Sequence, residues 1–272
     1  MVNVLGKGFI GGRYCELTPY VIVNDRNDYN VQSKNVLYFI STVDNYNVHT
    51  DPFVDIDTNL TTLIKTLQSC NEDTTFNFIS SWFVYGNTEL PAKETSACNP
   101  TGFYSITKRA AEQLLISYCE TKGIKYRILR LANVVGSQDK KVSKKKSALQ
   151  YMVNQVLNNE DVTLYDGGTL CRDYIHVDDV VQAINLVIEN GPVNEITNIG
   201  NGVPIAIRDA IEYAIKVTGS KSKLLNIEVP LFHKIVQTRD MVLDITKIKE
   251  LGYIPRYNIH KIIDSLVLNP TN

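Results

Sequence analysis

Residues 2–12 carry the sequence VNVLGKGFIGG, in which a short apolar run leads directly into Gly-x-Gly-x-x-Gly. A loop of this kind between a strand and a helix is typical of dinucleotide-binding sites. Gly6 is expected to make the tight turn, Gly8 to let the backbone approach a pyrophosphate, and Gly11 to let the helix pack against the strand. The start of the helix would offer free N–H groups to the phosphates. The expected cofactor-binding residues of the loop are Gly6, Gly8, Phe9, Ile10 and Gly11.

A second apolar run, Tyr20–Val23, is followed by Asn24, Asp25 and Arg26. An acidic residue at the tip of the second strand can hold the ribose hydroxyls of NAD and repel the 2′-phosphate of NADP. Asp25 stands fourteen residues after Gly11, where about twenty is usual, so the crossover helix must be short. A guanidinium at Arg26 could instead accept a 2′-phosphate, and Asp25 could simply belong to a turn. NAD is the expected cofactor, and NADP is the alternative.

Apolar runs alternate with amphipathic stretches through the first half of the chain. Residues 57–70 are expected to form a helix, because their leucines and Ile64 recur with helical spacing. A longer helix is expected over 103–122, ending before Gly123. Such alternation predicts a parallel, doubly wound α/β sheet that binds ligands at the carboxyl ends of its strands. Further strands are expected at Val36–Ser41, Phe76–Ser81 and Tyr126–Leu131.

The length of 272 residues suits one large α/β domain with a small appended lobe. We expect a Rossmann domain over residues 1–135 that carries the catalytic residues. A smaller, mainly substrate-binding lobe is expected over 136–272, with the chain able to cross between the two. The segment KKVSKKK at 140–146 predicts either a solvated surface loop or a lid that attracts phosphates.

The composition is that of an ordinary globular protein, with 44% hydrophobic and 21% charged residues. A formal net charge of −1 gives no general attraction to nucleic acid or to a membrane. No apolar run approaches the ~18 residues of a membrane span, and no signal peptide is visible. The five cysteines are scattered and form no Cys-x-x-Cys pair. They indicate reduced thiols in a cytoplasmic protein and no metal site.

Tyr104 and Lys108 stand four residues apart within the expected helix 103–122. Their side chains would therefore share one face, one turn apart. A nearby cation favours the phenolate form of a tyrosine, which can then act as a base near neutral pH. The spacing alone is also compatible with an ordinary surface helix, so its meaning depends on the rest of the chain.

With these elements in order, the chain resembles the extended short-chain dehydrogenase/reductase family, in particular its nucleotide-sugar epimerases and dehydratases. The resemblance extends over nearly the whole chain. The motifs that carry it are GFIG at 8–11, Asp51-Pro52 with Asn59, SSWFVYG at 80–86, Tyr104 with Lys108, RLANVVG at 130–136, RDYIHVDD at 172–179, and Arg239-Asp240 with LGYIP at 251–255.

The resemblance implies a catalytic triad, in which Tyr104 removes a proton from a sugar hydroxyl and Ser81 hydrogen-bonds the same oxygen. Lys108 would support the phenolate and bind the nicotinamide ribose. The ligand would be a nucleotide-diphosphate sugar, and a homodimer through helices 57–70 and 103–122 is implied as well. The expected substrate contacts are Ser81, Asn133, Arg172 and Arg239.

The residues after Ser81 bear on the reaction. Dehydratases of the family carry an Asp-Glu pair there and decarboxylating relatives a Glu, whereas this chain has Trp82 and Phe83. Because neither aromatic ring can move a proton, epimerisation by transient oxidation at C4 is the first expectation. The alternatives are an NAD(P)H-dependent 4-ketosugar reductase and a binder without turnover. The two rings either narrow the sugar pocket or pack in the core, and His176 is expected to be structural.

Overall fold

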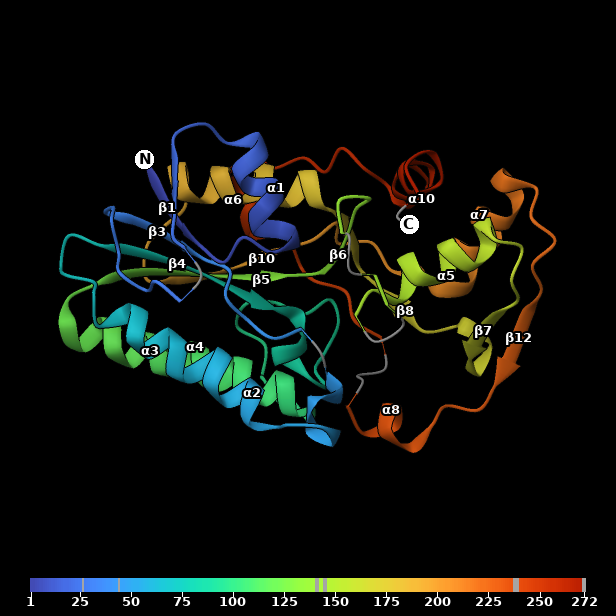
Figure 1. Cartoon of the computed structure of the whole chain (residues 1–272), viewed down its shortest axis with the longest axis horizontal. Helices are drawn as coiled ribbons and strands as arrows, with labels where there is room; N and C mark the ends of the chain where they lie inside the picture. Colours follow the sequence, from blue (N-terminus) through green and yellow to red (C-terminus); the bar gives the residue numbers. More distant parts are fainter. Residues whose placement is uncertain (26, 44, 140–141, 144–145, 237–239, 271–272) are drawn as a thin grey trace.

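The computed structural model describes residues 1–25, 27–43, 45–139, 142–143, 146–236 and 240–270. Its centre is a six-stranded sheet in which every described pairing is parallel, in the order β10-β5-β4-β3-β1-β2. Helices cover both faces of this sheet, as Figure 1 shows. The doubly wound parallel fold expected from the sequence is therefore confirmed. The strands are β1 (Val2–Leu5), β2 (Val21–Val23), β3 (Asn35–Tyr38), β4 (Thr75–Ser81), β5 (Lys125–Leu131) and β10 (Glu195–Ile199).

Each face of the sheet has its own core, because successive side chains of a strand point to opposite faces. Val4 and Leu37 pack on the side covered by α1 (Phe9–Leu17) and α6 (Val177–Asn190). Leu5 and Val36 pack on the side of α3 (Thr62–Leu67) and α4 (Phe103–Lys122). Burial on both faces explains why the strands are almost continuously apolar in the sequence.

The helix expected over 57–70 differs in its bounds and its regularity. It begins as α2 (Phe53–Ile56), passes through a π-helical turn, η2 (Asp57–Thr61), and continues as α3. The longer helix α4 has the expected bounds, and it ends where Gly123 takes a left-handed backbone conformation with φ +68°. Gly is favoured at such a helix end because it has no Cβ.

The order of the strands sets the place of the switch point, whereas the short spacing between the glycine loop and Asp25 follows from the nine residues of α1. The chain passes from β1 to β2 on one side and then returns to β3 on the other, so the topological switch point lies between β1 and β3. A six-stranded dinucleotide fold in the order 3-2-1-4-5-6 has two strands outside the first. Here only β2 is described outside β1, and residues 27–34 contain no helix or strand.

The remaining elements pack mainly beyond the carboxyl ends of these strands, around a third apolar core. Two parallel pairs are formed by β6 (Asn133–Val135) with β9 (Tyr174–His176) and by β7 (Val162–Tyr165) with β12 (Leu224–Ile227). An antiparallel pair joins β8 (Cys171–Arg172) to β11 (Ile205–Ala206). The helices of this part are α5 (Ala148–Leu157), α7 (Ile207–Thr218), α8 (Leu231–Val236) and α10 (Ile259–Leu268), whereas α9 (Thr246–Glu250) packs against β10 of the main sheet.

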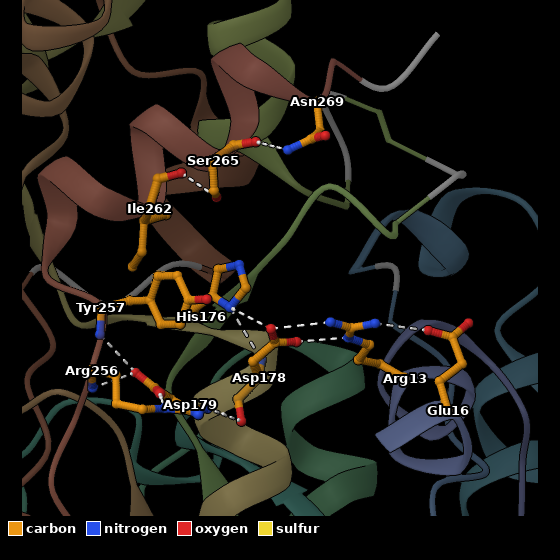
Figure 2. Close-up of polar contacts among 10 residues, drawn as sticks. All are labelled: Arg13, Glu16, His176, Asp178, Asp179, Arg256, Tyr257, Ile262, Ser265 and Asn269. Atoms are coloured by element: carbon orange, nitrogen blue, oxygen red, sulfur yellow. Dashed lines mark hydrogen bonds and ion pairs between the residues drawn. The ribbon is translucent and has the colours of Figure 1, made fainter.

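The chain crosses between the two parts more than once. After β9 the chain returns to the main sheet as α6 and β10, and then leaves it again. Figure 2 shows how α1 is tied to this crossing. The Arg13 guanidinium donates hydrogen bonds of 2.6 and 3.1 Å to the Asp178 carboxylate, while Arg256 donates one of 2.9 Å to Asp179.

His176 has a structural place in the same region. Its Nδ1 accepts a hydrogen bond from the Asp178 backbone N–H at the start of α6, and its ring stacks on Tyr257 at 3.9 Å.

Among the described residues, no helix is both long and apolar enough to cross a membrane.

Candidate active site

The glycine loop has the geometry that a close backbone approach requires. Gly6 has φ +96°, and a Cβ there would lie 2.9 Å from the Ile40 nitrogen, so the loops after β1 and β3 touch at the switch point. A Cβ on Gly11 would lie 2.1 Å from the Gly6 carbonyl oxygen. A Cβ on Gly8 would instead enter open space, and no described side chain caps the first turn of α1.

Asp25 lies just beyond the end of β2 and is exposed. The neighbouring Asn24 fixes the turn, because its side-chain amide donates to the carbonyl oxygens of Asp28 and Asn30. Its Oδ1 accepts a hydrogen bond of 2.6 Å from Asn3 in β1. The backbone at Asp25 is thus held at the carboxyl edge of the sheet, with its side chain exposed. Arg26 lies outside the described residues, so its predicted part in cofactor choice stays a prediction.

Ser81 ends β4, and its hydroxyl accepts a hydrogen bond from the Phe83 backbone N–H at 3.3 Å, which starts the 3₁₀ turn η3 (Trp82–Tyr85). The two aromatic rings that follow stack on each other, with centroids 3.9 Å apart. Trp82 is 3% exposed and Phe83 is half-buried, and both line the cavity described below. Both interpretations of the pair therefore hold: the rings pack in the core and also form a wall of the pocket.

Tyr104 lies in the first turn of α4 and is buried, and the ring of Phe83 meets its ring edge-on at 6.0 Å. Burial raises the pKa of Tyr104 to about 12, although hydrogen bonds with the hydroxyls of Ser81 and Ser41 lower it. The negative charge of Asp55 adds to the increase. The direction is opposite to the one that the Tyr-x-x-x-Lys pattern predicts, because desolvation of the phenolate outweighs every favourable contact.

Lys108 lies one turn further along α4 and is 2% exposed. Its ammonium donates a hydrogen bond of 2.8 Å to the Ile79 carbonyl of β4 and lies 4.1 Å from the centre of the Phe78 ring. Burial lowers its pKa to about 7, against the opposing effect of the Glu112 charge. The lysine is thereby fixed to the same strand that carries Ser81.

A cavity of about 340 Å³ joins the glycine loop to Tyr104 and to the C-terminal part. Its volume is within the ordinary range for small-molecule sites. The cavity brings together several of the residues that the sequence singles out: Phe9, Ile10, Ser81, Tyr104, Asn133 and Arg172.

Arg172 and Asn133 face this cavity from β8 and β6. The Arg172 guanidinium lies 5.4 Å from the centre of the Trp82 ring and donates to the Cys171 carbonyl at 2.9 Å. Burial lowers its pKa. The Asn133 amide donates to the Asp173 carbonyl at 3.1 Å, which orients the side chain. Arg239, the other expected diphosphate ligand, lies outside the described residues, as do Lys140, Lys141, Lys144 and Lys145.

An aromatic cluster that was not predicted from the sequence lines the same cavity. His233 Nε2 lies 2.7 Å from the Tyr46 hydroxyl and 3.5 Å from the Tyr165 hydroxyl, and Phe232 packs on Tyr46 with centroids 4.7 Å apart. The cluster joins α8 to η1 (Asn45–His49) and to β7. No spacing signal could have found it, because its members come from three distant segments.

Comparisons with known proteins show the family and the fold of the chain. The model of the NAD dependent epimerase/dehydratase family matches residues 25–200, a stretch that begins just after the glycine loop and α1. The low-salt glycan biosynthesis protein Agl12 of Haloferax volcanii is 27% identical over 220 residues, which are 80% of this chain and 68% of that protein.

A reductase and an epimerase are also similar to the chain. The dTDP-4-dehydro-6-deoxyglucose reductase of Escherichia coli is 26% identical over 185 residues, 68% of this chain and 57% of that protein. The structure of UDP-glucose 4-epimerase from Thermotoga maritima, with UDP-glucose, superimposes with a TM-score of 0.88 at 23% identity, over 98% of this chain and 97% of the other. The match thus spans 68% of Agl12 and 57% of the reductase, and as little as 27% of another curated relative.

Proposed function

Because the chain belongs to the NAD dependent epimerase/dehydratase family, we propose that it is an NAD-dependent nucleotide-sugar epimerase that acts by transient oxidation at C4. The observation that carries the proposal is the meeting of Ser81 and Tyr104 on one cavity with the glycine loop, while Trp82 and Phe83 fill the place after Ser81. Neither of these rings can remove or donate the protons that a dehydration needs.

The residues fit NAD at the glycine loop. The open space at Gly8 and the uncapped first turn of α1 suit a pyrophosphate. NAD, when bound, supplies a hydride acceptor and a positive charge on its oxidised ring. Asp25 would hold the adenosine ribose from the tip of β2.

Tyr104 is the proposed base, and Ser81 hydrogen-bonds the sugar oxygen as it becomes a carbonyl. Since the pKa of Tyr104 is raised to about 12, the phenol keeps its proton near neutral pH until positive charge enters the site. Lys108 supports the phenolate from the adjacent turn. The same phenol then returns the proton when the hydride comes back to the other face of the sugar.

The nucleotide-sugar diphosphate is assigned to the C-terminal side of the cavity. Guanidinium groups match phosphate oxygens in geometry and charge, and Arg172 is already held on the cavity wall by Trp82. Asn133 lies beside it, and Arg239 is the second proposed clamp. Binding an anion would relieve the desolvation that lowers the pKa of Arg172.

A 4-ketosugar reductase is the second candidate, favoured by the similarity to the E. coli reductase. Deuterium at C4 of the substrate separates the two reactions. With a panel of UDP- and dTDP-hexoses, an epimerase is expected to turn over many times on catalytic NAD and to retain the label at C4. Mass spectrometry and NMR of the product measure this, and absorbance at 340 nm measures NADH.

Stoichiometric oxidation of NAD(P)H with a 4-keto sugar, and no isomerisation without reductant, would replace the epimerase by the reductase. Binding of the nucleotide sugars without conversion of any would instead identify a binder without turnover.

A preference for NAD over NADP is expected, because the exposed Asp25 carboxylate would face the 2′-phosphate. Titration calorimetry with both cofactors measures the two affinities. Asp25→Asn should reduce the difference between the affinities for NAD and NADP. Asp28→Asn, a substitution in the same loop, should leave that difference unaltered. Tighter binding of NADP to the wild type would transfer the role to Arg26 and favour the reductase.

The homodimer is also a proposal. Three apolar side chains on α3 and α4 are at least one third exposed, at Ile64, Ile106 and Leu114. A second copy packed against these helices would cover them, and sedimentation equilibrium measures whether the chain is dimeric.

A further inference from the structure

Asp55 is a carboxylate in α2 that is 0% exposed and lies close enough to Tyr104 for its charge to act on the phenol. Its Oδ1 accepts hydrogen bonds from the Thr42 hydroxyl and, at 3.2 Å, from the Asn47 side-chain amide. Its Oδ2 has no hydrogen-bond partner within the part of the chain that the structure describes. Burying an acidic group with so few donors costs free energy, and such a cost requires an explanation.

The hydrogen bonds around Asp55 lead to α4. Asn59 lies in the π-helical turn η2 and is 2% exposed. Its amide donates to the hydroxyls of Thr42, at 2.9 Å, and Thr107, at 3.0 Å. The Thr107 hydroxyl in turn donates to the Tyr104 carbonyl at 2.9 Å. One branch of the network therefore ends on the backbone of the proposed catalytic tyrosine.

Ser41 lies on a second branch near the phenol. Its hydroxyl donates to the Thr42 carbonyl at 2.7 Å and to Asn59 Oδ1 at 3.0 Å, and its interaction with the Tyr104 side chain lowers the pKa of that phenol. The π-helical turn η2 begins two residues after Asp55 and contains Asn59. Such turns occur frequently at functional sites.

We propose that Asp55 is a positioning residue for Tyr104. Its carboxylate anchors Thr42, and hydrogen bonds through Thr42, Asn59 and Thr107 connect it to the Tyr104 carbonyl, so that its negative charge is held near the phenol. The inference rests on the proposed role of Tyr104 as the base.

The charge has a direct consequence for the phenol. Burial is the largest cause of the raised pKa of Tyr104, and the Asp55 carboxylate raises it further. Lys108 lies one turn along α4, and Glu112 acts on its pKa. Further ionisable residues line the cavity that Tyr104 faces: Asp139, Lys146, Arg172 and His233. Removing the Asp55 charge would bring the pKa of Tyr104 closer to neutral pH, the range in which a general base acts most efficiently.

The test measures Tyr104 directly and needs no substrate. Protein labelled with ¹³C at the tyrosine Cζ is titrated by NMR, and Tyr104→Phe identifies the resonance. Asp55→Asn is expected to lower the pKa of Tyr104, and Asp55→Ser, which also removes the charge, to do the same. Asp55→Glu should restore a value near the wild type. Asp57→Asn removes an exposed carboxylate two residues away and should change nothing.

Circular dichroism and thermal unfolding establish which variants are folded. An unchanged Tyr104 pKa in a folded Asp55→Asn or Asp55→Ser variant would overturn the proposal and leave Asp55 as an anchor of the loop at Thr42 and Asn47. The pH dependence of kcat provides a separate readout, namely the pH at which kcat falls on the acid limb of the profile. If the pKa of Tyr104 falls in the NMR titration but the limb does not move, the proposed role of Tyr104 as base fails while the inference about Asp55 stands.

Discussion

Tyr104→Phe is expected to lower kcat by about 10²–10⁴-fold, the contribution typical of general acid–base catalysis. The substitution removes only the phenolic oxygen. The ring would keep its buried place in the first turn of α4, with Phe83 edge-on against it. Affinity for NAD should change little, because the proposed NAD site at the glycine loop and α1 lies on elements other than α4, which carries Tyr104. Steady-state turnover of the nucleotide sugar and calorimetric titration of NAD measure the two effects.

Tyr118→Phe is the matched control for this prediction. Tyr118 lies further along the same helix and is packed against the core on the α3–α4 face of the sheet. Losing its hydroxyl should leave turnover unchanged. A Tyr104→Phe enzyme that retained more than about a tenth of the wild-type rate would show that another group removes the proton.

The fold could be predicted because its signals are local. The bounds of α4 follow from helical periodicity and from Gly123, and the loop after β1 follows from three glycines at fixed spacing. The short distance from Gly11 to Asp25 correctly predicted a short crossover helix. It did not predict that β2 would be the only described strand outside β1, because strand order depends on pairings between distant segments.

The site was less predictable, because its electrostatics depend on burial. A lysine four residues after a tyrosine suggested a lowered phenol pKa, yet in the fold Lys108 is held by the Ile79 carbonyl and Tyr104 is desolvated. Asp55 stands two residues before the helix predicted over 57–70, in a segment to which the sequence assigns no element and where an acidic residue is normally solvated. Only the packing of α2 against α4 shows that it is buried.

The largest stability effect is expected at Glu112, which is fully buried in α4 and carries three charged or polar partners. Its carboxylate accepts hydrogen bonds of 2.9 and 2.7 Å from Arg130 in β5, and others from Ser80 in β4 and Arg109. Glu112→Gln leaves the Arg130 guanidinium, 1% exposed, without its counter-charge. Breaking a buried pair in this way costs about 3–5 kcal/mol of unfolding free energy. Urea unfolding of the variant measures the loss.

Two further variants make this prediction specific. Glu120→Gln removes an exposed carboxylate from the same helix and should change the unfolding free energy by less than about 0.5 kcal/mol. Glu112→Leu combined with Arg130→Met replaces both charges by apolar groups, and it should recover most of the loss. If the Glu112→Gln variant unfolded at the same urea concentration as the wild type, the prediction would be wrong. The favourable interaction within the pair would then be cancelled by the cost of burying its two charges.

The difference in unfolding free energy between the wild type and Glu112→Gln depends on pH through the pKa of Glu112. Burial raises this pKa, but the hydrogen bonds and charge of Arg130, with Ser80 and Arg109, bring it below the ordinary value. A carboxyl group whose pKa is lower in the folded state stabilises the fold above its unfolded pKa, and the effect is lost as the pH falls through the folded value. The difference in unfolding free energy between the wild type and Glu112→Gln should therefore be largest near neutral pH and become smaller in acid.

The Glu112–Arg130 pair also fixes the two strand ends that carry the site, because Ser80 precedes Ser81 and Arg130 lies three residues before Asn133. Turnover should therefore fall along with stability.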